Sequence, residues 1–412
     1  MTSSPRPTSA PASPVRDTPG GARTRLHHLD ALRGGALLLG VLLHALMPYL
    51  PGDLWLIDDG SESTTAVLGV GVIHLFRMVL FMMLAGYFGR LVLHRRGVGA
   101  YLRDRLLRLG LPLVAFWPLL FALLVLGLIV AEAVHGAGVA TGSAPEDPQA
   151  TGTVLDLPTM HLWFLLLLLE IVLVVVAVRA VVVRLLGSER AARWSRRIGL
   201  LLAAPGGVVL AAVPYGLALV VQGRTGAGII EPYTLVPVLG ASIGYLGAFC
   251  TGWFLHAAPE ALSRAERPWP VHLALAAVLS AVTLLLPPSS LVLAAAVHAL
   301  AGWAWVFGLL GLCGRLLRRE HPAVRYLADS SYWVYLLHFP LLLLVAVPLA
   351  GTDWPWPLEL VIALAVVMGV LLLTYDLFVR STWIGRWLNG RRRESVLRGA
   401  RTGRRSAGAS VR

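Results

Sequence analysis

The chain has 412 residues, of which 57% are hydrophobic and 14% are charged, and its formal net charge is +13. This composition is too apolar for a soluble globular domain. The cations form short clusters between long apolar runs, which argues against nucleic acid as a partner, and the two cysteines lack the spacing of a disulfide framework or a zinc site.

The predicted elements begin after residues 1–25, a Pro-, Ser- and Arg-rich stretch typical of a disordered cytoplasmic tail and not of a signal peptide. About ten apolar runs then follow, each a candidate membrane-spanning helix. They are Ala31–Leu50, Val67–Leu93, Leu109–Ala131, His161–Leu186, Ile198–Val221, Leu235–Ala257, Val271–Leu286, Leu291–Leu312, Leu327–Ala350 and Leu358–Val379. The two runs beside Pro287–Ser290 form either two short helices or one interrupted hairpin. We expect an all-α polytopic membrane protein.

Arginine sets the expected orientation, because the sequence contains no lysine. Arginine clusters precede the first span and occupy every even-numbered connection, whereas the odd connections are acidic and hold one arginine, Arg224. Both termini are therefore expected in the cytoplasm, with a transmembrane domain over residues 26–390. The Arg-rich tail over residues 391–412 either contacts anionic membrane lipid or is a solvated topology anchor.

The first span contains an arginine and a histidine at helical spacing. Arg33 and His44 are eleven residues apart, which is about three turns and roughly 16 Å of rise on one helix face. Arg33 is expected at the cytoplasmic mouth and His44 toward the outer side. Each residue alone fits a structural role, but together in lipid they indicate a functional site. Asp30, one turn before Arg33, either orients its guanidinium or only starts the helix.

Further polar residues lie in later spans. His74 and Arg77 share a face in the outer third of the second span, where a buried arginine needs an anionic or carbonyl partner. We expect Arg77 to contact the acceptor or to stabilise an oxyanion. His161 is either an acceptor contact or an interfacial residue, and Trp163 beside it fits the aromatic belt at the membrane interface.

Three polar residues form one stripe of the ninth span, at i, i+4 and i+7: Ser331, Tyr335 and His338. The stripe fits interhelical hydrogen bonds, and a direct role at a site is the alternative. Glu170, at mid-depth in the fourth span, implies a cationic or protonated partner. Asp376 and Arg380 fit a structural i, i+4 pair.

Several segments together resemble the membrane acyltransferase-3 family. "LDALRGGALLLGVLLH", from Leu29, is similar to its first helix, whose signature is Arg, ten residues, then His. "FRMVLFMMLAGYFGRLVLHRRGVGAYLRDRLLRLGLP" resembles its second helix and basic inner loop, although Ala85 replaces the Ser that often precedes Gly86. "SYWVYLLHFP" resembles its late helix. "HLWFL", "GWFLH" and "STWIGRWLNG" are most similar to the glucan biosynthesis protein C group, and the similarity runs from Leu26 to Gly390.

The resemblance implies an enzyme of the cell membrane that moves an acetyl or succinyl group from cytoplasmic acyl-CoA to a hydroxyl of an extracytoplasmic glycan. His44 would be the general base, because imidazole accepts a proton near neutral pH. Arg33, Arg105 and Arg108 would hold the phosphates of the donor, although the last two also fit plain positive-inside residues. Acyl-CoA would be a cosubstrate, and no metal or tightly bound cofactor is required.

Two other classes of function remain open at this stage. A proton-coupled transporter or flippase could use intramembrane His, Arg and Glu, although paired repeats and broken half-helices in matching positions are not evident in the sequence. A structural scaffold would leave the Arg33 and His44 pair unexplained. The sequence does not determine the acyl group, the acceptor or the oligomeric state.

Overall fold

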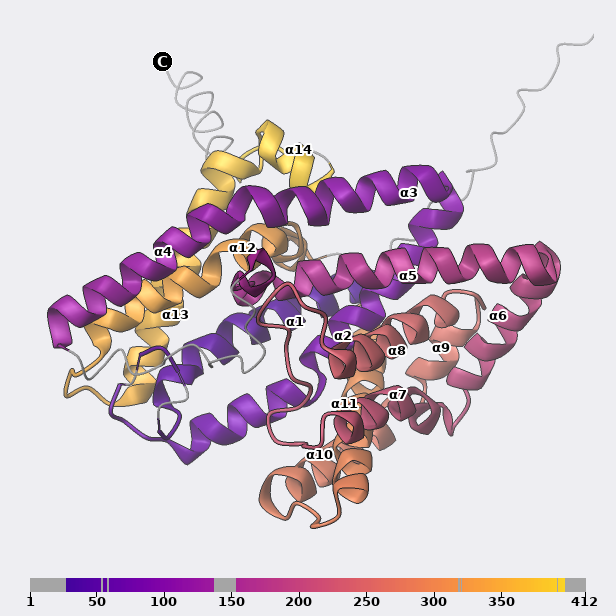
Figure 1. Ribbon diagram of the computed structural model, residues 1–412, viewed down its shortest axis with the longest axis horizontal. Helices are drawn as coiled ribbons and strands as arrows, with labels where there is room; N and C mark the ends of the chain where they lie inside the picture. The colour runs from indigo at the N-terminus through magenta and orange to yellow at the C-terminus, as the bar shows by residue number, and fades with distance from the viewer. Residues whose placement is uncertain are drawn as a thin grey trace, which may run out of the picture.

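The computed structural model describes residues 27–52, 55–57, 59–136, 153–317, 319, 321–390 and 392–396, and the regular elements in these ranges are helices (Figure 1). The α-helices are α1 (His27–Leu46), α2 (Thr64–Arg96), α3 (Val98–Arg105), α4 (Leu111–His135), α5 (Trp163–Leu186), α6 (Ser188–Leu202), α7 (Gly207–Val221), α8 (Leu239–Leu255), α9 (Ala261–Glu266), α10 (Trp269–Leu285), α11 (Leu291–Leu316), α12 (Pro322–Leu349), α13 (Trp356–Thr374) and α14 (Trp383–Asn389). The predicted N-terminal tail, residues 1–25, lies outside the described residues.

The all-α polytopic architecture is confirmed. In the described part of the chain, seven helices are long and apolar enough to cross a membrane, and the bent pair α6 and α7 counts as an eighth if it is one span. The two remaining predicted spans are α8 and α10, apolar helices of 17 residues each. At about 1.5 Å per residue they are shorter than the roughly 30 Å of a hydrocarbon core. The runs beside Pro287–Ser290 form two separate helices, α10 and α11.

The prediction of one continuous helix over Ile198–Val221 is wrong. The chain turns by 98° between α6 and α7, so the predicted span is divided between two helices. The turn contains Pro205, which lacks a backbone N–H, followed by Gly206 and Gly207. A Cβ at Gly207 would lie 2.0 Å from the Leu202 carbonyl oxygen, so only glycine fits this close turn. The apolar run is therefore interrupted by its backbone chemistry.

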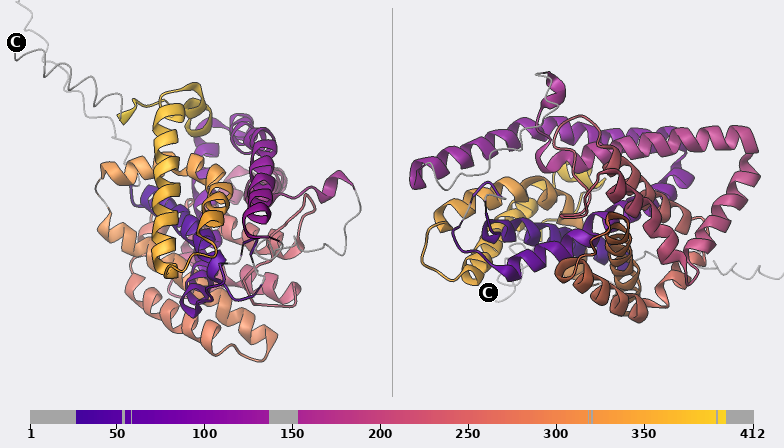
Figure 2. Two further views of the ribbon diagram at one scale, coloured as in Figure 1. Left: turned by 90° about the vertical axis from the view of Figure 1, so that its left-hand side faces the viewer. Right: turned by 60° about the horizontal axis from the view of Figure 1, so that its bottom comes forward.

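Helices α1 and α2 lie in the middle of the bundle. The first packs against α2, α11, α12 and α13, and the second packs against α1, α3, α8, α10 and α11. Helices α4 and α5 lie on one side of this pair, and α10 and α11 lie on the opposite side in both Figure 1 and the right-hand view of Figure 2. The two helices that carry Arg33 and Arg77 are therefore surrounded by other helices.

Glycines bring α2 and α8 into direct backbone contact. A Cβ at Gly86 would lie 1.9 Å from the Phe249 carbonyl oxygen, and a Cβ at Gly252 would lie 1.8 Å from the Met83 carbonyl oxygen. The two positions are reciprocal, since each glycine faces the backbone of the other helix. Small residues at such a crossing allow close van der Waals packing between membrane helices. This contact fixes the depth of α2 and therefore the position of Arg77 on it.

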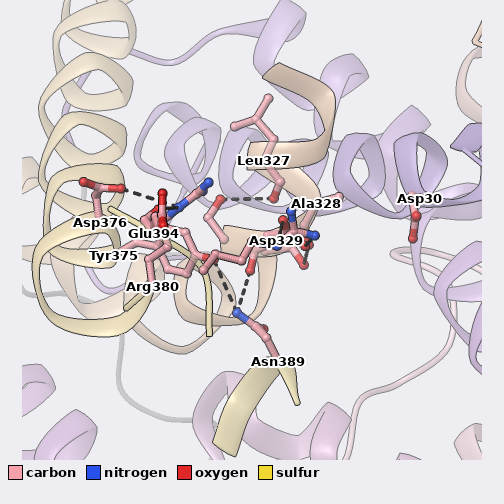
Figure 3. Close-up of polar contacts among 12 residues, drawn as sticks. Asp30, Leu327, Ala328, Asp329, Tyr375, Asp376, Arg380, Asn389 and Glu394 are labelled. Carbon is pink, nitrogen blue, oxygen red and sulfur yellow. Dashed lines mark hydrogen bonds and ion pairs between the residues drawn. The ribbon is translucent and has the colours of Figure 1, made fainter. Parts of the chain in front are cut away.

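The carboxyl end of the described chain returns to the bundle. Asp329 of α12 forms an ion pair with Arg393, with 2.9 Å between its Oδ2 and Nε, and its carbonyl oxygen accepts from Asn389 of α14 (Figure 3). Asp376 accepts from the Ser395 hydroxyl at 2.6 Å and pairs with Arg380 at 3.8 Å, as predicted. The first part of the predicted Arg-rich tail, residues 392–396, therefore lies against the helices, and the remainder of that tail is outside the described residues.

Candidate active site

Three histidines from separate elements meet in one cluster. His44 lies in the last turn of α1, His161 in the short helix η4 (Met160–Leu162) that precedes α5, and His338 within α12. The ring centroids of His44 and His338 are 5.3 Å apart, and those of His161 and His338 are 5.4 Å apart. Phe339 packs against both His44 and His161. The cluster joins three residues that the sequence placed in three different spans.

Backbone carbonyl groups hold two of the three rings. His161 Nε2 lies 3.0 Å from the Leu336 carbonyl oxygen, and His338 Nδ1 lies 2.8 Å from the Tyr335 carbonyl oxygen. Because a carbonyl oxygen only accepts, we assign the ring proton to each of these nitrogens. The Tyr335 hydroxyl donates to the His161 carbonyl oxygen at 2.7 Å. His161 and His338 are therefore each fixed in one tautomer.

His44 differs from its two neighbours. Neither of its ring nitrogens makes a hydrogen bond or ion pair to another residue in the described part of the chain, and its Nδ1 is buried. The ring lines a pocket between α1, α12, α13 and the connection that follows α1. Tyr49, Trp55 and Asp59 line the same pocket. His44 thus combines unpaired ring nitrogens with a position at a pocket wall.

Arg77 is a buried cation without a direct partner. Its side chain is 6% exposed, and it has neither an ion pair nor a hydrogen bond among the residues that the structure describes. The guanidinium lies against Gly40, where a Cβ would be 3.1 Å from its Nη1, one turn below His44 on α1. Glu231, in the connection from α7 to α8, is the carboxylate whose charge acts on Arg77. His74 precedes Arg77 by one turn on the same helix.

The other end of α1 carries the predicted cationic mouth. Arg33 donates to the Ala328 carbonyl oxygen of α12 at 3.2 Å and lies 3.7 Å from Asp30, the predicted orienting residue. Arg33 and His44 therefore both contact α12, at Ala328 and His338. Because Arg33 precedes His44 on α1 and Ala328 precedes His338 on α12, the two helices run side by side in the same direction. The shared helix face predicted for Arg33 and His44 agrees with these contacts.

Arg105 and Arg108 share one carboxylate. Asp104 lies 3.3 Å from Arg105 Nη2 and 3.1 Å from Arg108 Nε, and the Arg105 guanidinium also lies over the Tyr101 ring. Arg108 sits in η2 (Leu106–Gly110), a π-helical turn of the kind often found at functional sites. The Tyr332 hydroxyl of α12 donates to the Arg108 carbonyl oxygen. Arg33 and the backbone of Arg108 thus contact α12 one turn apart.

A second pocket opens beside the same end of α1. It is lined by Asp30 of α1 and by residues around the start of α12, including Arg319, His321 and Arg325. The sequence counted these arginines only as topology signals. The two pockets border α1 at Asp30 and at His44, which are 14 positions apart and so about 21 Å apart along the helix. One pocket is rich in basic side chains, and the other contains the free histidine.

Other expectations have mixed outcomes. Trp163 is 5% exposed and stacks on Tyr245, so it packs inside the bundle and does not form part of an interfacial belt. His161 is also buried by other parts of the protein. Tyr335 makes the expected interhelical hydrogen bond, but Ser331 donates to Ala328 of its own helix, and His338 likewise bonds within α12. The Ser331 hydroxyl and the His338 ring therefore hydrogen-bond to carbonyl groups of their own helix and not to another helix.

Glu170 has a neutral partner, since the Ser242 hydroxyl of α8 donates to it at 3.1 Å. The sequence pattern gave no functional weight to Trp55, Asp59 or Glu359, which lie near the C-terminal end of α1 and the N-terminal end of α13. Glu359 is fully buried. The sequence feature that could have indicated its importance is an acidic residue in the first turn of an apolar helix. Nothing in the sequence pattern indicated that Trp55 approaches His44.

Comparisons with known proteins identify the family of the chain. Residues 26–376 match the family described as an acyltransferase domain. Relatives include the glucans biosynthesis protein C of Shigella boydii serotype 4 and of Escherichia coli K12, each 23% identical to this chain over 372 residues. The aligned part covers 86% of this chain and 92% of each relative. No solved structure matches the chain.

Proposed function

Because the chain belongs to the acyltransferase-3 family of integral membrane proteins, we propose that it transfers an acyl group from cytoplasmic acyl-CoA to a hydroxyl of an extracytoplasmic glycan. The family match covers most of the chain and supports acyltransferase activity. The donor is our proposal, based on the basic side chains at one end of α1. The glucan acceptor is supported by the name of the relatives, at 23% identity.

One observation carries the proposal: His44 has unpaired ring nitrogens at the wall of a pocket, whereas the two neighbouring histidines donate to carbonyl groups. A neutral imidazole can take the proton of an acceptor hydroxyl while its oxygen attacks the thioester carbonyl. The new C–O bond forms, the C–S bond breaks, and the proton held by His44 passes to the departing thiolate. The products are an ester and free coenzyme A.

Arg77 is suited to stabilise the negative charge that develops during this step. A carbonyl oxygen becomes an oxyanion when the hydroxyl attacks, and a preorganised cation in a site of low dielectric stabilises it strongly. The Arg77 guanidinium lies next to Gly40, which precedes His44 by one turn of α1, and it forms no direct ion pair with the described residues. Glu231 acts on it through charge alone and would maintain its position.

The donor would enter from the opposite end of α1. Arg33, Arg105 and Arg108 are the predicted phosphate ligands, and the second pocket adds Arg319 and Arg325 near the same helix end. Phosphate groups bind such cations through charge-assisted hydrogen bonds. An extended donor anchored there would have to cross about 21 Å along α1 to bring its thioester to His44. This arrangement supports a donor and an acceptor that approach from opposite sides.

The test uses purified protein in nanodiscs with acetyl-CoA or succinyl-CoA and a glucose oligosaccharide, with the ester product measured by mass spectrometry. Wild-type protein should form ester with at least one donor, and His44→Gln should form very little. His272→Gln is a matched control, because His272 is also buried with an unpartnered Nδ1 but packs on Phe307 of α11. Absence of ester with both donors would refute the proposal, and altered glycan location without altered glycan mass in cells would favour transport.

A further inference from the structure

The pocket at His44 has two chemically different walls. Leu342 and Ala346 of α12 and Ala363 of α13 form an apolar wall, whereas His44 and Asp59 contribute polar groups. Ligand sites commonly combine an apolar lining with a few polar groups that orient the ligand. An acyl chain would need only the apolar wall. The polar wall therefore favours a ligand that carries hydroxyl groups.

Trp55 provides a flat surface at this pocket. Its ring centroid lies 5.9 Å from that of His44 with an interplanar angle of 30°, and the edge of Phe339 packs against it at 5.3 Å. The Trp55 side chain is partly exposed, so its ring is not fully covered by protein. A large, rigid aromatic ring beside a polar group suits the C–H face of a sugar ring, which is apolar although its edge is polar.

Asp59 supplies a carboxyl group to the pocket, and its charge and that of Tyr49 act on a second carboxyl group, Glu359. Thr352 donates to Glu359, which is fully buried. The Asp59 backbone N–H donates to the Pro48 carbonyl oxygen at 3.2 Å, which holds the residue beside the pocket. Its Oδ2 is buried and has no hydrogen-bond partner among the described residues, so this oxygen can accept from a ligand.

We propose that this pocket is the acceptor subsite, in which Trp55 stacks on a neutral sugar ring and Asp59 binds its hydroxyl groups while one hydroxyl faces His44. The inference rests on the proposed function, since it places the acceptor beside the proposed base. The ligand class follows from the combination of a flat aromatic ring, an unpartnered carboxyl oxygen and an apolar wall.

The experiment compares two acceptors in nanodiscs at fixed acyl-CoA: a glucose tetrasaccharide and glycerol, which has hydroxyl groups but no ring. Trp55→Ala should lower kcat/KM for the tetrasaccharide about tenfold more than for glycerol, because only the sugar ring can stack. Trp354→Ala is the matched control, since Trp354 lies in the connection before α13, is 49% exposed and does not line the pocket. An equal loss for both acceptors, or no loss for either, would overturn the subsite.

A second variant tests the subsite independently in case Trp55→Ala does not fold. Asp59→Asn preserves shape and should raise KM for the tetrasaccharide about tenfold, because a hydrogen bond to a charged acceptor is replaced by a weaker one, with KM for acyl-CoA unchanged. Asp353→Asn, at an exposed position in the connection before α13, should change neither constant. An unchanged tetrasaccharide KM in Asp59→Asn would overturn the role of Asp59. If no acceptor is acylated by wild-type protein, the proposed function fails, whereas transfer that ignores Trp55 and Asp59 contradicts only the subsite.

Discussion

Replacing His44 by glutamine separates proton transfer from packing, because glutamine keeps a hydrogen-bonding side chain but cannot take up a proton near neutral pH. Loss of a general base lowers the rate about 100- to 10,000-fold, which corresponds to about 2.7–5.4 kcal/mol of activation free energy. The structure gives a much smaller expected effect on folding. His44 makes no hydrogen bond to the described residues, so the variant loses mainly ring contacts with Trp55, His338 and Phe339.

The neighbouring histidine gives the opposite expectation. His161→Leu removes the donor to the Leu336 carbonyl oxygen, and an unsatisfied buried acceptor costs about 1–3 kcal/mol. His44→Gln should therefore lose most activity with little change in thermal unfolding, whereas His161→Leu should unfold at a lower temperature and retain more activity when folded. Thermal unfolding in detergent and initial rates of ester formation in nanodiscs measure the two effects separately.

The pH dependence supplies an independent readout of the same residue. A neutral imidazole accepts a proton and a protonated one cannot, so wild-type transfer should fall as the pH drops through the titration of His44. The residual rate of His44→Gln should lack this acidic limb. Wild-type turnover in His44→Gln, or the same acidic limb in both proteins, would refute His44 as the base and direct attention to His161 or His338.

Three further predictions concern charge and orientation. Arg33→Gln should raise KM for acyl-CoA more than KM for the acceptor, because phosphate contacts are charge-assisted, and the exposed Arg193→Gln is its control; steady-state titration of each substrate decides this. Arg77→Gln should lower kcat about 100- to 1,000-fold with smaller effects on KM, and an unchanged kcat in rate measurements would exclude an oxyanion role. With Cys250 and Cys313 replaced, a cysteine at Glu62 should react with an impermeant thiol reagent in whole cells, and one at Arg193 should not. Reversed labelling would contradict the sidedness of donor and acceptor.

The sequence alone determined the features that depend on chain composition and local spacing. Apolar runs in lipid form helices because no other arrangement satisfies the backbone of a single segment, so the all-α polytopic class followed directly. The spacing of Arg33 and His44 on one helix fixed their shared face, because helical geometry relates them without any other part of the chain. The break between α6 and α7 was not predicted from the apolar pattern, although Pro205 and Gly206 account for it once the structure is known.

Only the tertiary structure decided which polar residues meet and which are already satisfied. The sequence singled out His44 through its spacing from Arg33, but only the structure showed that His161 and His338 already bond to carbonyl groups of α12 while His44 does not. Trp55 and Glu359 join His44 at one end of the bundle only because α1, α12 and α13 pack together there. Hydrogen bonding and contact depend on distances of a few ångströms between separate helices, and a pattern within one helix contains no information about those distances.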